Sequence, residues 1–210
     1  MTTMKDRIFG GKLFTDMCEG MPEERTNAKK LQLELNNSSP EDPKARMEII
    51  QKIFGTTEAG CWIEPPFYFA YGTHIKPGNG VYINVNCTFI DDGLITLGDH
   101  VMFGPCVTIA TVGHPINPEM RMYMYTDAVE IGNNCWIGAN AVICPGVHIG
   151  DNTVIGAGSI VTSDIPANVV AAGNPCRVIR EINEHDMQYY YKDRPFDEED
   201  LAEEKKLRGE

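Results

Sequence analysis

The chain has 210 residues, 42% of them hydrophobic, and a formal net charge of −12 at pH 7. That acidity argues against general nucleic-acid binding, which needs a basic surface, although a few local arginines could hold one anionic ligand. No apolar run approaches the roughly 20 residues of a membrane span. The seven cysteines are an odd number and contain no CxxC pair, so we expect buried thiols in a reducing cytoplasm.

Two helices are expected within a helical N-terminal segment, residues 1–56. Met21-Pro22-Glu23-Glu24 places proline and acidic side chains where a first helical turn tolerates them. Ser39-Pro40-Glu41-Asp42 does so again, with Ser39 as the expected N-cap. The second helix carries apolar residues at mostly helical spacing as far as Phe54 and stops at Gly55. Its apolar face should cover the start of the repeat that follows.

A six-residue repeat occupies the middle of the chain. A period of six fits neither a helix nor a hairpin, but it suits short flat strands that each send one aliphatic side chain into a shared interior. We therefore expect a solenoid over residues 57–176 and a polar extension over 177–210. The repeated positions are Ile131, Ile137, Ile143, Ile149, Ile155 and Val161, with compact companions four places later at Cys135, Ala141, Val147, Thr153, Ser159 and Ile165. Earlier runs are Leu97, Phe103 and Ile109 in one phase and Ile63, Phe69, Ile75, Val81 and Cys87 in another.

Two interruptions separate these runs, a short slip around residues 91–94 and an insertion over about residues 111–130. A coil needs no twenty-residue excursion to close its core, so the insertion is a candidate functional loop. It contains His114, between Gly113, expected to let the backbone approach a ligand, and Pro115, expected to stiffen the loop. A histidine titrates near neutral pH and suits a general base. From residue type alone, a surface histidine in a mobile loop is the alternative.

The hexads resemble those of the hexapeptide-repeat acyltransferases and, among them, of the galactoside and maltose O-acetyltransferases. Besides the hexads, the resemblance rests on Gly11 to Gly20, on Gly113-His114-Pro115 and on Ala171 to Arg177. It implies a left-handed parallel β-helix that transfers an acetyl group directly from acetyl-CoA to a hexose-type hydroxyl. It further implies His114 as the general base, no metal, and a homotrimer with active sites between subunits.

The resemblance also assigns binding residues. It implies that the acceptor sugar is bound by Asp16, Asn84 and Asp92, with Met124 at the border of the pocket. The coenzyme A arm and phosphates are assigned to Trp136, Ala139, Ala157, Thr162, Ser163, Arg177 and Arg180. From the residues alone, Asp16 could cap a helix, and Ala139 and Ala157 could merely serve tight corners.

Three departures bear on specificity. Ala70 replaces a serine that helps hold the sugar in the galactoside type, and Ser163 replaces a common lysine near coenzyme A. The loop between Arg121 and Ile131 also looks shorter than in that type. A galactoside, glucosyl, maltosyl or other acceptor is therefore open.

Two other function classes are alternatives. A β-helical carbonic anhydrase would hold zinc between subunits with histidines, but His100 is fourth and His148 sixth in their hexads, and His114 has no neighbouring histidine. A non-catalytic coil could serve as a scaffold or sugar-binding module. The glycine-flanked His114 and the pair Arg177 and Arg180 argue against that module.

Overall fold

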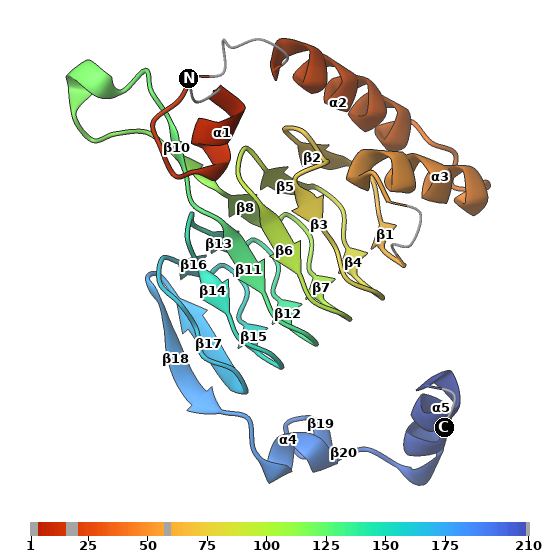
Figure 1. Ribbon diagram of the computed structural model, residues 1–210. Coiled ribbons are helices and arrows are strands. Elements are labelled where there is room, and N and C mark those ends of the chain that lie inside the picture. Colours follow the sequence, from red (N-terminus) through yellow and green to blue (C-terminus); the bar gives the residue numbers. More distant parts are fainter. Residues whose placement is uncertain (1–3, 16–20, 57–59, 209–210) are drawn as a thin grey trace.

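The computed structural model describes residues 4–15, 21–56 and 60–208. The chain winds through three parallel sheets that enclose one apolar core (Figure 1), as a parallel β-helix does. Sheet 1 contains β1 (Trp62–Ile63), β4 (Tyr82–Ile83), β7 (Met102–Phe103), β12 (Trp136–Ile137), β15 (Val154–Ile155) and β17 (Val169–Gly173), with β18 (Cys176–Glu181) antiparallel at its edge. Sheet 2 contains β2 (Phe67–Phe69), β5 (Cys87–Ile90), β8 (Thr108–Ala110), β13 (Val142–Ile143) and β16 (Ile160–Val161). Sheet 3 contains β3 (Ile75–Lys76), β6 (Ile95–Leu97), β11 (Val129–Ile131) and β14 (His148–Ile149).

The aliphatic hexad positions stack on one another in the core. Ile137 pairs in register with Phe103 on one side and Ile155 on the other, and both neighbours are buried. Ile143 lies in the same way between Ile109 and Val161. The predicted period of six over residues 131–161 is therefore confirmed.

The phase predicted for the first coils is wrong at Ile75, Val81 and Cys87. Ile63 pairs with Ile83 and Phe69 pairs with Phe89, so Ile83 and Phe89 are the stacked equivalents. Val81 and Cys87 are buried two residues before these equivalents, at companion positions. Ile75 is buried at a companion position as well, because it pairs with Ile95, two residues before the stacked Leu97. The reason is that the coil from Ile63 to Ile83 is two residues longer than the coil from Ile137 to Ile155.

The residues in excess of the six-residue repeat are inserted at one corner, which we call the sheet 2–3 corner. Residues 70–74, 91–94 and 111–128 join sheet 2 to sheet 3 in three successive coils. The slip at 91–94 and the insertion were expected, but the extra residues at 70–74 were missed. Stacking places these three irregular segments next to one another.

Small residues allow the coils to approach closely at the other corners. A Cβ atom on Gly138 would lie 2.5 Å from the backbone nitrogen of Ala157 in the next coil. Asn134 and Asn152 adopt positive φ at their turns, which asparagine tolerates better than most residues. Their side chains form a ladder, because Nδ2 of Asn134 donates to Oδ1 of Asn152 at 3.2 Å.

Two helices, α2 (Met21–Asn36) and α3 (Pro43–Phe54), cover the first coils (Figure 1). The N-cap of α3 is Asp42, whose Oδ1 accepts from the backbone of Ala45, and not Ser39 as predicted. Ser39 is too early because Pro43 is the proline that starts the helix. The predicted end at Gly55 is confirmed by its left-handed φ of 66°. The apolar face is buried as expected, at Ile49, Ile50, Ile53 and Phe54.

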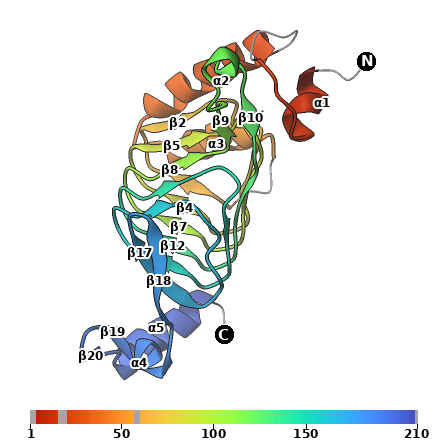
Figure 2. The same cartoon turned by 90° about the vertical axis from the view of Figure 1, so that its left-hand side faces the viewer.

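Both ends of the chain add elements that the sequence patterns did not predict. A short helix α1 (Met4–Phe9) lies near the insertion, and β18 covers the edge strand β17. Beyond β18 the structure contains α4 (Glu184–Gln188), β19 (Tyr189–Tyr191), β20 (Arg194–Pro195) and α5 (Glu198–Arg208). Figure 2 shows these elements at the opposite end of the solenoid from α2. None of the helices in the described ranges is long and apolar enough to cross a bilayer.

Candidate active site

His114 follows the strand β9 (Val112–Gly113) in the insertion, and its imidazole is exposed. Its Nδ1 lies 2.8 Å from the carbonyl oxygen of Arg121 and 2.9 Å from that of Tyr123. Carbonyl oxygens can only accept hydrogen bonds, so Nδ1 must carry the proton. In the neutral ring the lone pair is therefore on Nε2, which can accept a proton.

Hydrogen bonds within the insertion hold the backbone around His114. The strand β10 (Tyr125–Thr126) returns antiparallel to β9, and a short 3-10 helix, η1 (Pro118–Met120), is capped by Asn117. Gly113 was predicted to admit a ligand, but a Cβ atom there would lie 2.6 Å from the Tyr125 hydroxyl oxygen. The glycine therefore makes room for Tyr125.

The N-terminal segment packs against the base of the insertion. Phe14 and Met124 exchange two backbone hydrogen bonds of 2.9 Å. Met124, predicted to border the acceptor pocket, is buried in a second apolar cluster together with Phe14 and Ala70. Asp16, the first predicted acceptor residue, lies outside the described residues.

Asp92 lies at the sheet 2–3 corner, where its side chain is 2% exposed. The Nη2 atom of Arg25, from α2, lies 3.3 Å from Oδ1 of Asp92, and the Arg25 guanidinium lies 5.5 Å from the ring centre of Tyr71. A buried carboxylate needs such a charged partner. The same corner contains a cavity of about 670 Å³. It is lined by Arg25, Thr26, Lys29, Lys30, Leu33, Phe69, Ala70, Ile90 and Asp92.

Asn84, Ala139 and Ala157 lie at a different corner, between sheets 1 and 2. The Asn84 Oδ1 accepts from the backbone of Val85 at 2.8 Å, which supports its turn. Ala139 and Ala157 occupy equivalent places in successive coils, as the approach of Gly138 to Ala157 shows. One predicted acceptor residue and two predicted coenzyme residues therefore share a corner.

Thr162 and Ser163 are exposed and follow β16, at the sheet 2–3 corner. Trp136 is 53% exposed on the outer side of sheet 1, in register with Met102. The predicted acceptor and coenzyme residues described so far thus lie at the two corners that border sheet 2, and Trp136 lies on the outer face of the neighbouring sheet 1.

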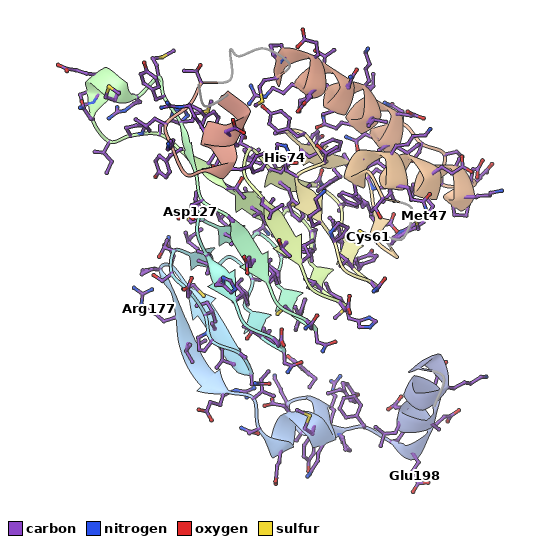
Figure 3. The ribbon with its side chains drawn as sticks, in the orientation of Figure 1. Met47, Cys61, His74, Asp127, Arg177 and Glu198 are labelled. Atoms are coloured by element: carbon purple, nitrogen blue, oxygen red, sulfur yellow. The ribbon has the colours of Figure 1, made fainter. Side chains whose placement is uncertain are left out.

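Arg177 and Arg180 lie on β18 and have different surroundings. Figure 3 shows the Arg177 side chain pointing away from the solenoid, and its Nη1 donates to the carbonyl oxygen of Cys176 at 2.7 Å. Arg180 instead donates to both carboxylate oxygens of Asp186, at 2.6 and 2.7 Å. These bonds lower the pKa of Asp186 to about 2. Among the described residues, the Arg177 side chain therefore has no carboxylate partner, whereas that of Arg180 has one.

Several residues that build the sheet 2–3 corner were not predicted from the sequence, namely Arg25, Tyr71, His74 and Asp91. The acidic pair of Asp91 and Asp92 directly after a strand was an available signal, but only Asp92 was singled out. Among the described residues, no group of three or more histidine, cysteine, aspartate or glutamate side chains is placed to hold a metal ion. His100, His114 and His148 lie respectively at a corner, in the insertion and on β14.

Known proteins are similar to this chain in sequence and in fold. Residues 128–163 match the bacterial transferase hexapeptide (six repeats) family, and residues 8–58 match the maltose acetyltransferase hexapeptide capping motif. The galactoside O-acetyltransferase of Escherichia coli (strain K12) is 54% identical over 192 residues, which are 90% of this chain and 95% of that protein.

Solved structures agree. A galactoside acetyltransferase in complex with coenzyme A superimposes with a TM-score of 0.90 at 52% identity, covering 94% of this chain and all of that one. A maltose O-acetyltransferase from Clostridium difficile 630 gives a TM-score of 0.78 at 39% identity, covering 87% and 98%. The chain belongs to the hexapeptide-repeat acetyltransferases of the galactoside and maltose type.

The pair of Arg180 and Asp186 predicts a pH dependence. A carboxyl whose pKa is lowered by folding stabilises the fold above its unfolded value of 3.8, and this contribution is lost as the pH falls through about 2. In an NMR titration, the Asp186 carboxyl should titrate near 2 in the wild type and return towards 3.8 in Arg180→Ala. Lys192→Ala is the control, because the Lys192 ammonium lies over the ring of Tyr191. This variant should leave the pKa of Asp186 low. A wild-type Asp186 that titrates near 3.8 would contradict the pairing.

Proposed function

We propose that the protein is an acetyl-CoA-dependent O-acetyltransferase that acts on a hydroxyl of a hexose or hexoside. The observation that carries this proposal is the hydrogen bonding of His114, whose Nδ1 donates to two carbonyl oxygens and leaves Nε2 to act as the base. The same two carbonyls stabilise the imidazolium that forms when Nε2 takes a proton. The family relatives, which include a structure with coenzyme A, support the donor.

The reaction then proceeds in one ternary complex. The acceptor hydroxyl oxygen bonds to the thioester carbonyl carbon while its proton moves to Nε2 of His114. The carbon–sulfur bond breaks, and the coenzyme A thiolate leaves and takes the proton back from the imidazolium. Asp92, held by Arg25, is suited to accept a hydrogen bond from another sugar hydroxyl.

Cys61 and Cys87 are unsuited to carry an acetyl group during the reaction, which supports direct transfer. Burial raises the pKa of Cys61 to about 12 and that of Cys87 to about 11. Thiols with such pKa values stay protonated and are poor nucleophiles at neutral pH. The cysteines within the described ranges are all free, which suits the reducing cytoplasm that we propose as the location.

The residue at position 70 does not select one particular sugar as the acceptor. Its methyl group lines the cavity beside Asp92 and offers no hydroxyl to a sugar. The relatives include proteins named for galactoside and for maltose. We propose a hexose or hexoside acceptor, with galactosides, glucosides and maltose all as candidates.

We further propose a homotrimer with active sites between subunits. Large apolar side chains are exposed on the insertion, where Ile116 is 92% and Met122 85% exposed, and on sheet 1, at Met102 and Trp136. Exposed apolar surface of this kind is typical of interfaces. Sedimentation should give three times the chain mass of 23.3 kDa without added metal. A monomer with full activity would contradict this assembly.

Replacement of His114 tests the proposed base. His114→Ala should lower kcat by roughly 10²–10⁴-fold, the usual effect of removing a positioned base. The melting temperature should hardly change because His114 is exposed. The Kd for coenzyme A should hardly change because the coenzyme contacts are assigned to other residues. His148→Ala is the control, since His148 is an exposed histidine that contacts only Glu130 among the ion pairs described. Near-full activity of His114→Ala would remove this residue from the mechanism.

Replacement of Arg177 tests the donor site. Arg177→Ala should raise the KM for acetyl-CoA about tenfold and leave the KM for the sugar unchanged, because a contact to a remote phosphate contributes mainly ground-state binding. Arg180→Ala should have a smaller effect, since Arg180 is bound to Asp186. Raised salt should weaken donor binding in the wild type more than in Arg177→Ala. Equal donor KM values at low salt would show that Arg177 does not bind the coenzyme.

A further inference from the structure

Asp91, the neighbour of Asp92, has a carboxylate that is completely buried. Its Oδ1 accepts hydrogen bonds from the backbone N–H groups of Ala70 at 2.8 Å and Tyr71 at 2.9 Å. Its Oδ2 accepts from the N–H of Gly72 at 2.7 Å. One side chain therefore binds three consecutive amides of the preceding coil.

These amides belong to the segment with the extra residues at 70–74. That segment bulges from the coil, so the regular ladder between coils cannot satisfy its amides, and the carboxylate of Asp91 does so instead. The bulge has little freedom on its other side. A Cβ atom on Gly72 would lie 2.7 Å from the side chain of Ile53 in α3.

The same corner is bonded to the next segments along the stack. Nδ1 of His74 lies 2.7 Å from the carbonyl oxygen of Asp91, and the His74 ring stacks on Tyr71 with 4.7 Å between centres. Figure 3 shows His74 beside α1. The Thr111 hydroxyl, at the base of the insertion, accepts from the N–H of Gly93 at 2.8 Å and donates to the carbonyl oxygen of Ile90 at 2.9 Å. Asp91 thus lies at the centre of three bonded segments.

Each of these segments carries part of the proposed site. Ala70 and Asp92 line the cavity, and the insertion that starts at Thr111 carries His114. The carboxylates of Asp91 and Asp92 belong to adjacent residues, but only that of Asp92 lines the cavity. A change in the bonds of Asp91 would move the wall that faces the acceptor without removing any group from it.

We propose that Asp91 is a positioning residue for the acceptor, which holds residues 70–72 and Asp92 in the geometry that binds the sugar. This role rests on the proposed function. A charged carboxylate suits it because two oxygens with several lone pairs can accept all three N–H groups. An asparagine would keep the shape but supply one acceptor oxygen and place an NH₂ group against a backbone N–H.

Asp91→Asn tests this role through the separation of acceptor and donor effects. The KM for the acceptor should rise, and kcat/KM for the acceptor should fall by at least roughly tenfold, the scale expected when a group that orients a substrate is displaced. The Kd for coenzyme A, measured by calorimetry, should stay within about twofold, because the residues assigned to the coenzyme lie in other coils. Hydrogen exchange without substrates should accelerate at the amides of Ala70, Tyr71 and Gly72.

Thr153→Val is the matched control. Thr153 is also completely buried, and its hydroxyl donates to the carbonyl oxygen of Pro166 at 2.8 Å, at the corner between sheets 3 and 1. It should lower the melting temperature without changing the acceptor KM. Hydrogen exchange at residues 70–72 reports on Asp91→Asn as long as that variant folds.

His74→Asn is the second variant, for the case that Asp91→Asn does not fold. It removes only the imidazole ring that contacts the carbonyl oxygen of Asp91, and it should also raise the acceptor KM.

Three results would overturn the role of Asp91: an unchanged acceptor KM in the folded variant, an equal loss of acceptor and coenzyme binding, or unchanged exchange at residues 70–72. If Asp91→Asn does not fold, an unchanged acceptor KM in His74→Asn would overturn it as well. The exchange result is independent of activity. Accelerated exchange combined with a wild type that acetylates no sugar would therefore reject the proposed function and not the bonds of Asp91.

Discussion

Hydrogen bonding between successive coils is the constraint on which the rest of this structure depends. Each inner strand is bonded to the coils before and after it, so Ile137 stays level with Phe103 and Ile155. Extra residues cannot be absorbed within a strand, because they would shift every side chain behind them out of the core. They leave at the sheet 2–3 corner, where the segments at 70–74, 91–94 and 111–128 accumulate in neighbouring coils. The irregular backbone then needs its own partners, and Asp91 and Thr111 provide them.

Charge is distributed to suit the proposed chemistry. A chain with a net charge of −12 repels an anionic coenzyme at long range, so local cations must hold it. Arg177 is available for that role, whereas Arg180 is occupied by Asp186. At the sheet 2–3 corner the carboxylate of Asp92 is paired with Arg25, and two backbone carbonyls in the insertion fix the tautomer of the His114 ring. The groups that would bind sugar and take a proton are therefore oriented before substrates arrive.

The sequence predicted what repeats and failed where the chain departs from the repeat. Ile131 to Val161 follow the period because each coil there has the same length. Ile75, Val81 and Cys87 were given the wrong phase because the extra residues at 70–74 carry no mark in the pattern. The N-cap was placed at Ser39 and not at Asp42 because Pro40 and Pro43 both suit a first helical turn. The role of Asp91 depends on amides about twenty residues earlier in the chain, which a local pattern cannot reveal. The elements from Glu184 to Pro195 are too short to show a period, and α5 contains only three apolar residues, Leu201, Ala202 and Leu207.

Initial-rate kinetics with acetyl-CoA and sugar varied together test the central claim most directly, because they ask whether the acetyl group passes straight to a sugar hydroxyl. Thiol release should require the sugar, equal the acetyl ester formed, and give intersecting reciprocal plots across galactosides, glucosides and maltose. Parallel plots, or an acetylated protein formed without sugar, would contradict direct transfer in a ternary complex. Release that no sugar accelerates would contradict the proposed acceptor class.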